Sequence, residues 1–395
     1  MRVALYSETF APHVDGLVTR LTHTLTWLNR FGDEVLVIAP SLDGLPGEFA
    51  GARVISAPSM VIPMYRDLKF GFPLLFPRIR AAIDAFAPDV IHAVNPFLTS
   101  VGGVRYAQRS GTPLIASFHT QVAEYVSRYH LGLLRQPLWR HVIRLHNRAD
   151  LNLCTSHPMQ AALRARGIHE VALWAPGVDA EQFTPAQRSR EWRARLSAGR
   201  PDATILLYVG RLAPEKSLER LLPMLHRLPN VHLAFVGAGP EASSLRRLYA
   251  GAPVTFMGSL SGQELAAAYA SADIFTLPSS TETLGLAAIE AMASGLPVIG
   301  ADRGGIPDIV RDGETGLLFD PDQPETLIHA AAMLVDDPAR RRQMGDAALE
   351  RAQRWSWEES TRGLRAYYEQ AIQRRGRPAS RLASVTPCSA TRSPC

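Results

Sequence analysis

The stretch IFTLPSSTETLGLAAIEAMASGLPVI, residues 274–299, decides the fold. It opens with a short apolar run at 274–277 and closes with another at 297–299, and a helical segment lies between them. Runs that are apolar throughout are typical of strands that helices cover on both faces. The stretch therefore predicts a strand, a helix and a second parallel strand, joined by a right-handed connection.

The same alternation extends over most of the chain in two series. The first series of expected strands covers residues 3–6, 35–39, 90–94, 114–118 and 151–155. The second covers residues 205–209, 233–236, 254–257, 274–277 and 297–299. Helical patterns lie between the strands, for example at 17–31 and 77–86. Two such series predict an α/β protein with two Rossmann-like domains, each a doubly wound parallel sheet.

A polar, arginine-rich segment at 184–203 reads as the junction between the two series. A chain of 395 residues has the length of two ordinary domains. We expect an N-terminal Rossmann-like domain, a short junction, a second Rossmann-like domain, C-terminal helices that cross back to the first domain, and a disordered basic tail. Their bounds are 1–185, 186–203, 204–337, 338–372 and 373–395.

The composition is that of an ordinary globular protein, with 46% hydrophobic and 20% charged residues. It excludes a fibrous, disordered or disulfide-scaffold protein. The charge is divided unevenly, because residues 1–200 hold 22 basic and 15 acidic residues (+7), whereas residues 201–372 hold 15 and 22 (−7). This asymmetry indicates two units with different partners.

The compartment can be predicted from cysteine usage and from apolar runs. Three cysteines without metal-binding spacing predict a reducing cytosol and no structural zinc. The start MRVALYSETF reads as a strand rather than a signal peptide, and no apolar run approaches the ~18 residues of a membrane span. Any membrane contact is therefore expected to be peripheral. The segment 125–146 fits either a basic amphipathic segment at a membrane surface or a core-packing helix with a solvated face.

The strongest chemical signal lies between the two apolar runs at 274–277 and 297–299. Glu282 comes just before the helix and Glu290 inside it, eight positions apart. Eight helical positions leave the two side chains about 80° out of line, so they cannot form a tight acid pair within one helix. They suit two hydroxyl-binding groups at the ends of one extended ligand, and helix-start amides between them suit a diphosphate. Those amides belong to Thr283, Leu284, Gly285 and Leu286. The alternative is a surface helix with a capping threonine and two unrelated glutamates.

Two cations follow the strand at 205–209, in the sequence GRLAPEKS. Arg211 and Lys216 would lie at the tip of a strand–helix loop, where a pair of cations suits a diphosphate. Lys216 is one of two lysines in the chain, the other 40 basic residues being arginine. The alternative is a pair of salt bridges to Glu215 and Glu219.

The first domain offers two weaker candidates. Gly16 can let the backbone approach a ligand closely at the start of the helix at 17–31, although an ordinary loop glycine explains it equally well. His119 follows the strand at 114–118 and can donate a hydrogen bond to a sugar or assist proton movement. A structural histidine is the alternative. Lys69, in YRDLKF, is a candidate for contact with lipid or an anionic sugar, or else a solvated loop residue.

Two further motifs are set aside. The sequence Asp320-Pro321-Asp322 resembles a metal-binding pair, but Asp322 is followed by Pro324 and Glu325 and reads as a helix cap. We therefore expect no metal site and no cofactor. The glycines of GAG at 237–239 lack the rest of a dinucleotide fingerprint, so a NAD site is not expected.

These residues resemble glycosyltransferase family 4, enzymes of the two-Rossmann GT-B fold that use nucleotide-sugars. The resemblance is carried by GRLAPEKS and ETLGLAAIEAMASGLPVI, and it extends over roughly residues 1–335 through further segments. These are SETFAPHVDGLVTRLTHTL, VNPF, SFHTQ, LNLCTS, WAPGVDAEQF, LLYVGRL and GGIPDIVRDGETGLLF. Within the family the pattern is similar to sulfoquinovosyl-diacylglycerol synthases and related bacterial lipid glycosyltransferases. It implies two domains that face each other across a cleft.

The resemblance also implies roles for single residues. Arg211 and Lys216 would bind the donor diphosphate and stabilise the leaving group. Glu290 would hold the ribose, while Glu282 and His119 would contact the sugar. Backbone contacts to the donor are implied for Gly16, Leu260, Leu284, Gly285 and Leu286. The family retains the anomeric configuration and needs no bound metal.

The expected function is transfer of a sugar from a UDP-sugar, with UDP-sulfoquinovose a candidate, to a membrane lipid such as diacylglycerol. The alternative is a GDP-mannose-dependent α-mannosyltransferase that acts on a glycolipid or polysaccharide. A catalytically idle nucleotide-sugar sensor is disfavoured by the intact charged residues. A nucleic-acid partner is not expected, because the acidic second half would repel phosphates. We expect a cytoplasmic protein with peripheral contact to the inner face of the cell membrane.

Overall fold

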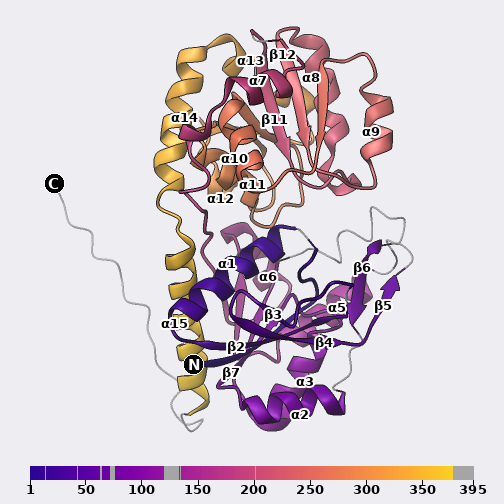
Figure 1. Cartoon of the computed structure of the whole chain (residues 1–395), viewed down its shortest axis with the longest axis vertical. Helices are drawn as coiled ribbons and strands as arrows, with labels where there is room; N and C mark the ends of the chain where they lie inside the picture. Colours follow the sequence, from indigo (N-terminus) through magenta and orange to yellow (C-terminus); the bar gives the residue numbers. More distant parts are fainter. Residues whose placement is uncertain are drawn as a thin grey trace, which may run out of the picture.

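The computed structural model describes residues 1–13, 15–41, 43–62, 65–71, 76–119, 133, 135–200 and 202–376. Between residues 60 and 71 it describes the backbone alone. The described chain forms two α/β domains, one above the other in Figure 1. The predicted fold class is therefore confirmed.

The first domain is built on a sheet of eight strands in the order β10-β9-β8-β7-β1-β2-β4-β3. All neighbours are parallel except the short edge strand β3, which is antiparallel to β4. The strands are β1 (Arg2–Ser7), β2 (Glu34–Pro40), β3 (Glu48–Phe49), β4 (Ala52–Ala57), β7 (Val90–Val94), β8 (Leu114–Ser117), β9 (Leu151–Cys154) and β10 (Val171–Leu173). A separate antiparallel pair is formed by β5 (Ser59–Ile62) and β6 (Tyr65–Gly71).

Helices cover both faces of this sheet. They are α1 (Gly16–Arg30), α2 (Pro77–Phe86), α3 (Val101–Ser110), α5 (Arg135–His146) and α6 (His157–Ala165). The packing of strand β1 explains its apolar sequence. Val3 and Leu5 pack into the buried cluster on one face of the sheet, and Ala4 and Tyr6 pack into the cluster on the other face. A strand packed on both sides has no face left for polar residues.

The second domain is built on a six-stranded parallel sheet in the order β13-β12-β11-β14-β15-β16. Its strands are β11 (Thr204–Val209), β12 (Val231–Val236), β13 (Val254–Gly258), β14 (Ile274–Leu277), β15 (Val298–Ala301) and β16 (Gly316–Phe319). Its helices are α7 (Arg190–Leu196), α8 (Leu222–Arg227), α9 (Ala242–Leu248), α10 (Gly262–Ser271), α11 (Leu286–Ala293), α12 (Ile306–Ile309), α13 (Pro324–Asp336) and α14 (Pro338–Ala352). Short 3-10 turns lie at Pro185–Gln187, Pro214–Lys216 and Leu218–Leu221. Helix α7 lies in the expected junction and packs on this domain through Trp192 and Leu196.

The final helix, α15 (Trp357–Arg375), returns to the first domain and runs along its side in Figure 1. Its residues Leu364, Tyr368 and Ala371 are fully buried in the core of the first domain. Helix α15 continues to Arg375, three residues into the segment expected to be a tail, and Arg375 pairs with Asp150 at 2.7 Å. Residues 377–395, the rest of the expected tail, lie outside the described residues.

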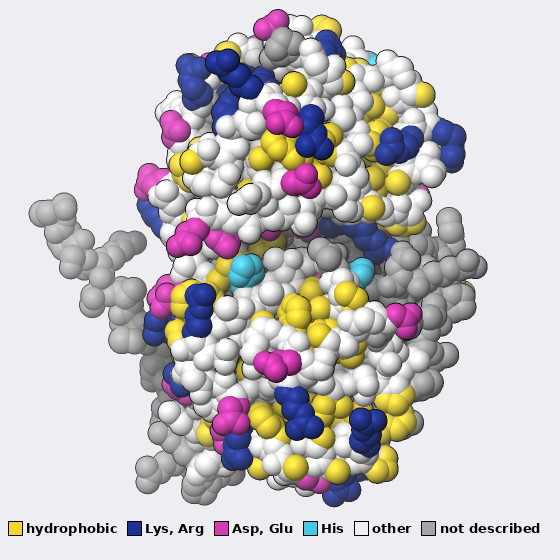
Figure 2. Space-filling view, in the orientation of Figure 1, with side chains coloured by type: hydrophobic (Ala, Val, Ile, Leu, Met, Phe, Trp, Pro, Cys, Tyr) yellow, Lys and Arg dark blue, Asp and Glu magenta, His cyan; other side chains and the backbone are white. Residues whose placement is uncertain are grey.

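The order of strands reverses at one point in each sheet. In the first sheet β1 lies between β7 and β2, and in the second β11 lies between β12 and β14. Loops leave the carboxyl ends of two neighbouring strands in opposite directions at such a point, which opens a crevice for a ligand. Figure 2 shows a groove between the two domains, lined in part by Lys or Arg side chains.

Among the described helices none is both long and apolar enough to cross a bilayer. Within the segment 125–146 the structure describes residue 133 and helix α5. In α5 the apolar side chains Trp139, Val142 and Leu145 are buried, and Trp139 stacks on Phe118 at 5.9 Å between ring centroids. The described part of this segment is therefore a core-packing helix.

Candidate active site

The crevice of the second domain brings the expected charged residues together. Arg211 follows β11 and Glu282 follows β14, and these two strands are neighbours. Lys216 lies in the 3-10 turn after Arg211, and its ammonium pairs with the carboxylate of Glu282. Residues 66 positions apart in sequence thus share one ion pair at the carboxyl end of the sheet. The pair is largely enclosed, with 20% and 14% of the two side chains exposed.

Arg211 lies beside this ion pair but is more open. Its side chain is 35% exposed, and one guanidinium nitrogen is 3.9 Å from the carboxylate of the buried Glu215. The sequence alternative of a salt bridge to Glu215 is therefore present as a long contact.

The loop from Glu282 to Leu286 is held tightly from both sides. The carbonyl of Glu282 accepts a hydrogen bond from the amide of Gly305 at 2.8 Å. Gly285, with φ of 84°, ends the loop and begins α11; a side chain there would meet Ile306 at 2.8 Å. Among the described residues, no backbone hydrogen bond is recorded for the amides of Leu284, Gly285 and Leu286. These N–H groups are the kind that bind phosphate at a helix start.

Glu290 lies in α11 with its carboxylate next to the hydroxyl of Tyr269, which donates to it at 2.8 Å. Burial raises the pKa of this carboxyl group to about 7, against the lowering effect of the tyrosine hydrogen bond. The structure thus separates the two glutamates as expected: Glu282 lies in the loop with a cation, and Glu290 lies in the helix with a neutral partner.

His119 reaches the same place from the first domain. Its ring nitrogen Nε2 is 2.9 Å from the hydroxyl of Ser117, and its amide donates to the side chain of Asn95 at 3.3 Å. Its carbonyl accepts a hydrogen bond from the hydroxyl of Thr283 at 2.6 Å, across the domain boundary. Burial, with a contribution from the charge of Arg20, holds the pKa of His119 well below its usual value, so the imidazole is neutral.

The two domains meet at further points around this contact. The hydroxyl of Thr155 donates to the carbonyl of Thr283 at 2.6 Å. Gly16 lies against α11, because a Cβ atom at this position would be 3.6 Å from the side chain of Leu286. Gly16 therefore lies next to the side chain of the first residue of α11, and its expected backbone approach to a ligand stays a prediction.

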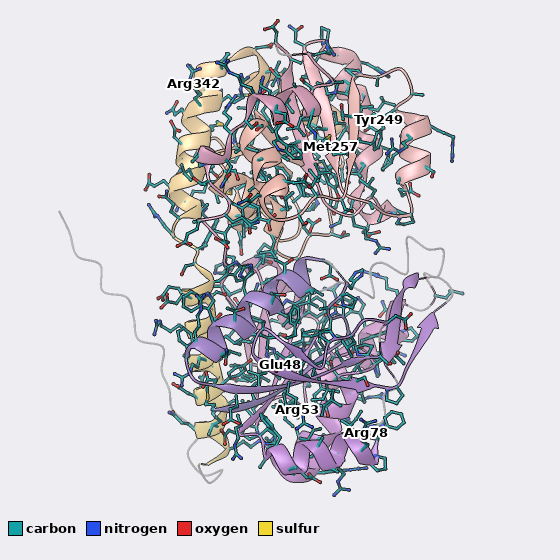
Figure 3. The ribbon with its side chains drawn as sticks, viewed as in Figure 1. Glu48, Arg53, Arg78, Tyr249, Met257 and Arg342 are labelled. Carbon is teal, nitrogen blue, oxygen red and sulfur yellow. The ribbon has the colours of Figure 1, made fainter. Side chains whose placement is uncertain are left out.

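Leu260 lies apart from the other candidates. It follows β13, the outer strand of the second sheet, and packs half-buried on the core of that domain. Met257, near the end of β13, is labelled in the upper domain in Figure 3. None of the hydrogen bonds and ion pairs described above involves Leu260, and its expected contact with a base stays a prediction.

Sequence reasoning missed two residues that shape the first-domain side. The carboxylate of Glu8, a residue that is 3% exposed, accepts hydrogen bonds from four successive amides in the segment just before α3, from Phe97 to Ser100, at 2.8 to 3.0 Å. Arg20 is buried over the ring of Trp174 at 3.9 Å. The position of Glu8 directly after a strand was a signal that could have been used. No signal in the sequence marked Arg20.

The pair Asp320 and Asp322 is a surface feature. Both carboxylates contact the guanidinium of Arg303, at 3.3 and 2.8 Å. The helix that follows is capped at Gln323, so the expectation that Asp322 caps it is wrong. Among the described residues, no group of three or more His, Cys, Asp or Glu side chains could hold a metal ion.

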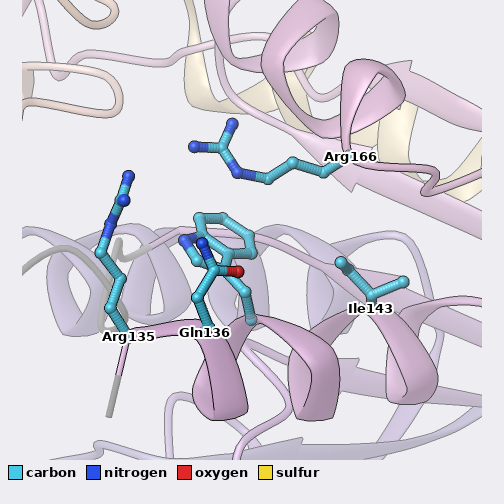
Figure 4. Close-up of a pocket in the computed structure, with 5 residues that line it drawn as sticks. Arg135, Gln136, Ile143 and Arg166 are labelled. Atoms are coloured by element: carbon cyan, nitrogen blue, oxygen red, sulfur yellow. The ribbon is translucent and has the colours of Figure 1, made fainter. Parts of the chain in front are cut away.

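A small pocket lies in the first domain between α5 and Arg166, the residue that follows α6 (Figure 4). Trp139 lines it, and the guanidinium carbon of Arg166 lies 4.4 Å from the centroid of that ring. The remaining lining residues are Arg135, Gln136 and Ile143. None of the site residues predicted from the sequence lines this pocket.

Comparison with known families and proteins gives consistent results for both domains. Residues 14–182 match the family described as Glycosyltransferase Family 4, and residues 191–351 match the family described as Glycosyl transferases group 1. The chain is 40% identical over 372 residues to a sulfoquinovosyl transferase of Arabidopsis thaliana, covering 92% of this chain and 72% of that protein.

Two further relatives extend the comparison. A GDP-mannose-dependent alpha-mannosyltransferase of Mycolicibacterium smegmatis is 38% identical over 380 residues, covering 95% of this chain and 99% of the relative. Among solved structures, a sucrose-phosphate synthase from Thermosynechococcus elongatus superposes with a TM-score of 0.80 at 26% identity, covering 94% of this chain and 99% of the other.

Proposed function

Because the chain belongs to glycosyltransferase family 4, we propose that it transfers a sugar from a nucleotide-sugar to a membrane lipid acceptor such as diacylglycerol, with retention of anomeric configuration. The observation that carries the proposal is that Thr283, directly after the Glu282 of the Lys216–Glu282 ion pair, donates a hydrogen bond to the carbonyl of His119 in the first domain. We infer that this point holds the diphosphate-linked sugar. The proposed division of the chain keeps the acceptor side in residues 1–185 and the donor side in 204–337.

The second domain supplies the groups that such a reaction needs. Breaking the bond between sugar and diphosphate leaves negative charge on the diphosphate, and fixed cations and amides stabilise that charge. Arg211, Lys216 and the amides at the start of α11 fill this role. Glu282 orients Lys216 before the donor binds and takes a sugar hydroxyl as a second partner. Glu290 accepts hydrogen bonds from the ribose hydroxyls.

The proposed reaction is metal-independent and uses no carboxylate nucleophile. The acceptor hydroxyl attacks the sugar on the face that the diphosphate leaves. At that moment the sugar cation and the departing diphosphate still form an ion pair. The acceptor proton passes to the leaving phosphate oxygen, so the products are a glycosylated acceptor and a nucleoside diphosphate. Neutral His119 contributes a hydrogen bond to the sugar and carries no charge of its own into the site.

For the donor we propose a UDP-sugar, with UDP-sulfoquinovose as the first to test, because the sulfoquinovosyl transferase relative is 40% identical over nearly the whole chain. GDP-mannose is the second candidate. It is favoured by the GDP-mannose-dependent mannosyltransferase relative, whose full length this chain spans at 38% identity.

A donor panel with membrane lipid extract tests the proposal. The purified chain is incubated with radiolabelled UDP-sugars or GDP-mannose, and the label in the lipid fraction is counted. Label from a UDP-sugar supports the first candidate, and label from GDP-mannose alone supports the second. Release of free sugar from every donor, without label in lipid, would contradict a lipid acceptor. The variant Lys216→Ala is the control for transfer by this site.

Peripheral membrane contact is a separate part of the proposal. The first 200 residues carry a net charge of +7, which favours an anionic surface. Lys69 lies on β6, and its side chain lies outside the described residues. We expect the protein to sediment with anionic vesicles at low salt and to stay in the supernatant at high salt. Equal recovery with neutral and anionic vesicles would contradict an electrostatic contact.

A further inference from the structure

A continuous hydrogen-bonded chain runs beneath the site from the C-terminal helix to His119. The hydroxyl of Tyr368 on α15 is 2.8 Å from Nδ1 of His92 on β7. Nε2 of His92 is 2.8 Å from the hydroxyl of Ser117 at the end of β8, and that hydroxyl is 2.9 Å from Nε2 of His119. We call these four side chains the Tyr368–His119 chain; they are at most 9% exposed and come from three separate segments.

Each of the four side chains, when neutral, carries one hydrogen on nitrogen or oxygen that it can donate. The Tyr368–His119 chain has three hydrogen-bond contacts. Among the described residues, Nδ1 of His92 is the acceptor within reach of the Tyr368 hydroxyl, so this O–H must donate to it or stay buried without a partner. His92 then holds its proton on Nε2 and donates to Ser117. The hydroxyl of Ser117 in turn has one remaining acceptor, Nε2 of His119.

The opposite direction leaves the hydroxyl hydrogen of fully buried Tyr368 unpaired. If His119 donated from Nε2, the hydrogen bonds would run back to Tyr368, whose O–H would be buried without an acceptor. An unpaired buried hydrogen costs more than a hydrogen bond gains. Four hydrogens share three contacts, so one hydrogen lies outside them in either direction. When the direction starts at Tyr368, that hydrogen is on Nδ1 of His119, an atom that is not among the described buried atoms without a partner, and Nε2 of His119 is an acceptor.

We propose that the hydroxyl of Tyr368 fixes the tautomer of His119 through this chain, so that His119 keeps its proton on Nδ1 and donates it in a hydrogen bond to the sugar being transferred. Tyr368, His92 and Ser117 are positioning residues in this proposal. The part that concerns the sugar rests on the proposed function, whereas the tautomer itself does not.

The surroundings keep the Tyr368–His119 chain neutral, as the assigned proton positions require. Burial lowers the pKa of His92 to about 3 and raises that of Tyr368, so neither group ionises at neutral pH. The buried guanidinium of Arg20 lowers the pKa of both His92 and His119, and His146 adds to the effect on His119. The helix that supplies Tyr368 comes back from the second domain, so the proton position of His119 depends on the docking of α15.

Nitrogen-15 NMR of the full-length chain labelled on its histidine rings tests the tautomer directly. The signals of His119 are assigned by their loss in His119→Gln. In the wild type we expect a protonated Nδ1 and an unprotonated Nε2. In Tyr368→Phe and in Ser117→Ala we expect both nitrogens to shift toward an exchanging mixture. Tyr367→Phe is the matched control, because the hydroxyl of Tyr367 donates to the carbonyl of Leu173, which is not part of the Tyr368–His119 chain.

The outcomes separate cleanly. A proton on Nε2 of His119 in the wild type overturns the proposal, and so does an unchanged spectrum in both Tyr368→Phe and Ser117→Ala. If Tyr368→Phe fails to fold, Ser117→Ala alone decides. These NMR spectra are recorded without a nucleotide-sugar, so a wrong choice of substrate cannot produce the same results.

A kinetic measurement connects the tautomer to catalysis. With a donor that supports transfer, Tyr368→Phe is expected to lower kcat about tenfold, the effect of one hydrogen bond, and to leave KM for the donor within about twofold. Tyr367→Phe is expected to leave both unchanged. Loss of kcat in both tyrosine variants would point to a damaged α15 instead, and would contradict the relay.

Discussion

The two sides of the site are built in different ways. On the second-domain side, Glu282, Glu290 and the amides between them come from one short stretch, and Lys216 joins them from the loop of the neighbouring strand. On the first-domain side, His119 depends on Asn95, on Ser117 and, through His92, on a tyrosine of the last helix. The second-domain half thus offers charged groups, most of them from one stretch, whereas the first-domain half offers a neutral histidine that distant segments hold in place. The difference suggests that substitutions act on chemistry in one half and on geometry in the other.

The largest expected effect tests the charged half. Lys216→Ala removes the cation proposed to stabilise the leaving diphosphate, and transfer is expected to fall by about 10²–10³ in kcat. The fold should stay intact, because the residue lies at the edge of the crevice, and circular dichroism checks this. Arg227→Ala, which removes an exposed cation of the same domain, is the control. Turnover near that of the wild type in Lys216→Ala would remove the diphosphate assignment.

Glu290 gives the charged half a pH signature. Its pKa is raised from 4.5 to about 7 in the folded chain, so its protonated form stabilises the fold at low pH, and that contribution is lost as pH rises from about 4.5 through 7. Glu290→Gln stays neutral at every pH. Between pH 5 and 8, the wild type is expected to lose up to about 3 kcal/mol of stability relative to this variant.

Chemical denaturation of both proteins at several pH values measures this difference. Glu264→Gln, at an exposed position at the start of α10, should follow the wild type at every pH. A difference between wild type and Glu290→Gln that does not change with pH would contradict the raised pKa.

Glu8 tests the geometric half. Glu8→Gln replaces an oxygen that accepts amide hydrogens by an NH₂ group that repels them, just before α3. Stability is expected to fall by about 1–3 kcal/mol, the cost of unpaired buried donors. Thermal unfolding measures the loss. Glu48→Gln, at the exposed residue labelled in Figure 3, is the control and should change stability very little. Equal losses of stability in both variants would contradict a stabilising role of the Glu8 carboxylate.

The smallest effect concerns the contact between the halves. Thr283→Val removes the hydrogen bond to the carbonyl of His119, and about 0.5–1.5 kcal/mol of stabilisation of the closed arrangement is expected to be lost. A severalfold rise in KM for the donor would report it. Thr283→Ser keeps the hydroxyl and should behave as the wild type. If serine and valine perturb the enzyme equally, the hydroxyl contact is not what matters.

The core strands were predictable because strands packed on both faces must be apolar throughout. Strand β14 and strand β7 match the predicted 274–277 and 90–94. Strand β4 was missed, because its residues Arg53 and Ser56 are exposed and break the apolar run. Strand β16 was missed as well: it forms the far edge of its sheet and is only four residues long, and Leu318 on it is only partly buried.

The candidate site divides along the same line. The loop around Glu282 was predictable because the chemistry of a phosphate site needs free amides and nearby cations within a few residues. The pairing of Lys216 with Glu282 and the hydroxyl contact between Thr283 and His119 were not predicted. They join residues 66 and 164 positions apart, and residue type alone does not say which distant groups will meet.

By itself the sequence determined the two series of buried strands, the loops that carry the charges and the family to which the chain belongs. Local patterns suffice for these, since burial, helix starts and strand ends are governed by neighbours along the chain. Only the tertiary structure decided that Tyr368 of the final helix reaches His92, and that the ring of His119 thereby has a defined hydrogen-bond direction. The reason is that the hydroxyl of Tyr368, which among the described residues can donate to His92 alone, sets the direction of every hydrogen bond from it to His119. Only folding brings this hydroxyl of the last helix next to His92.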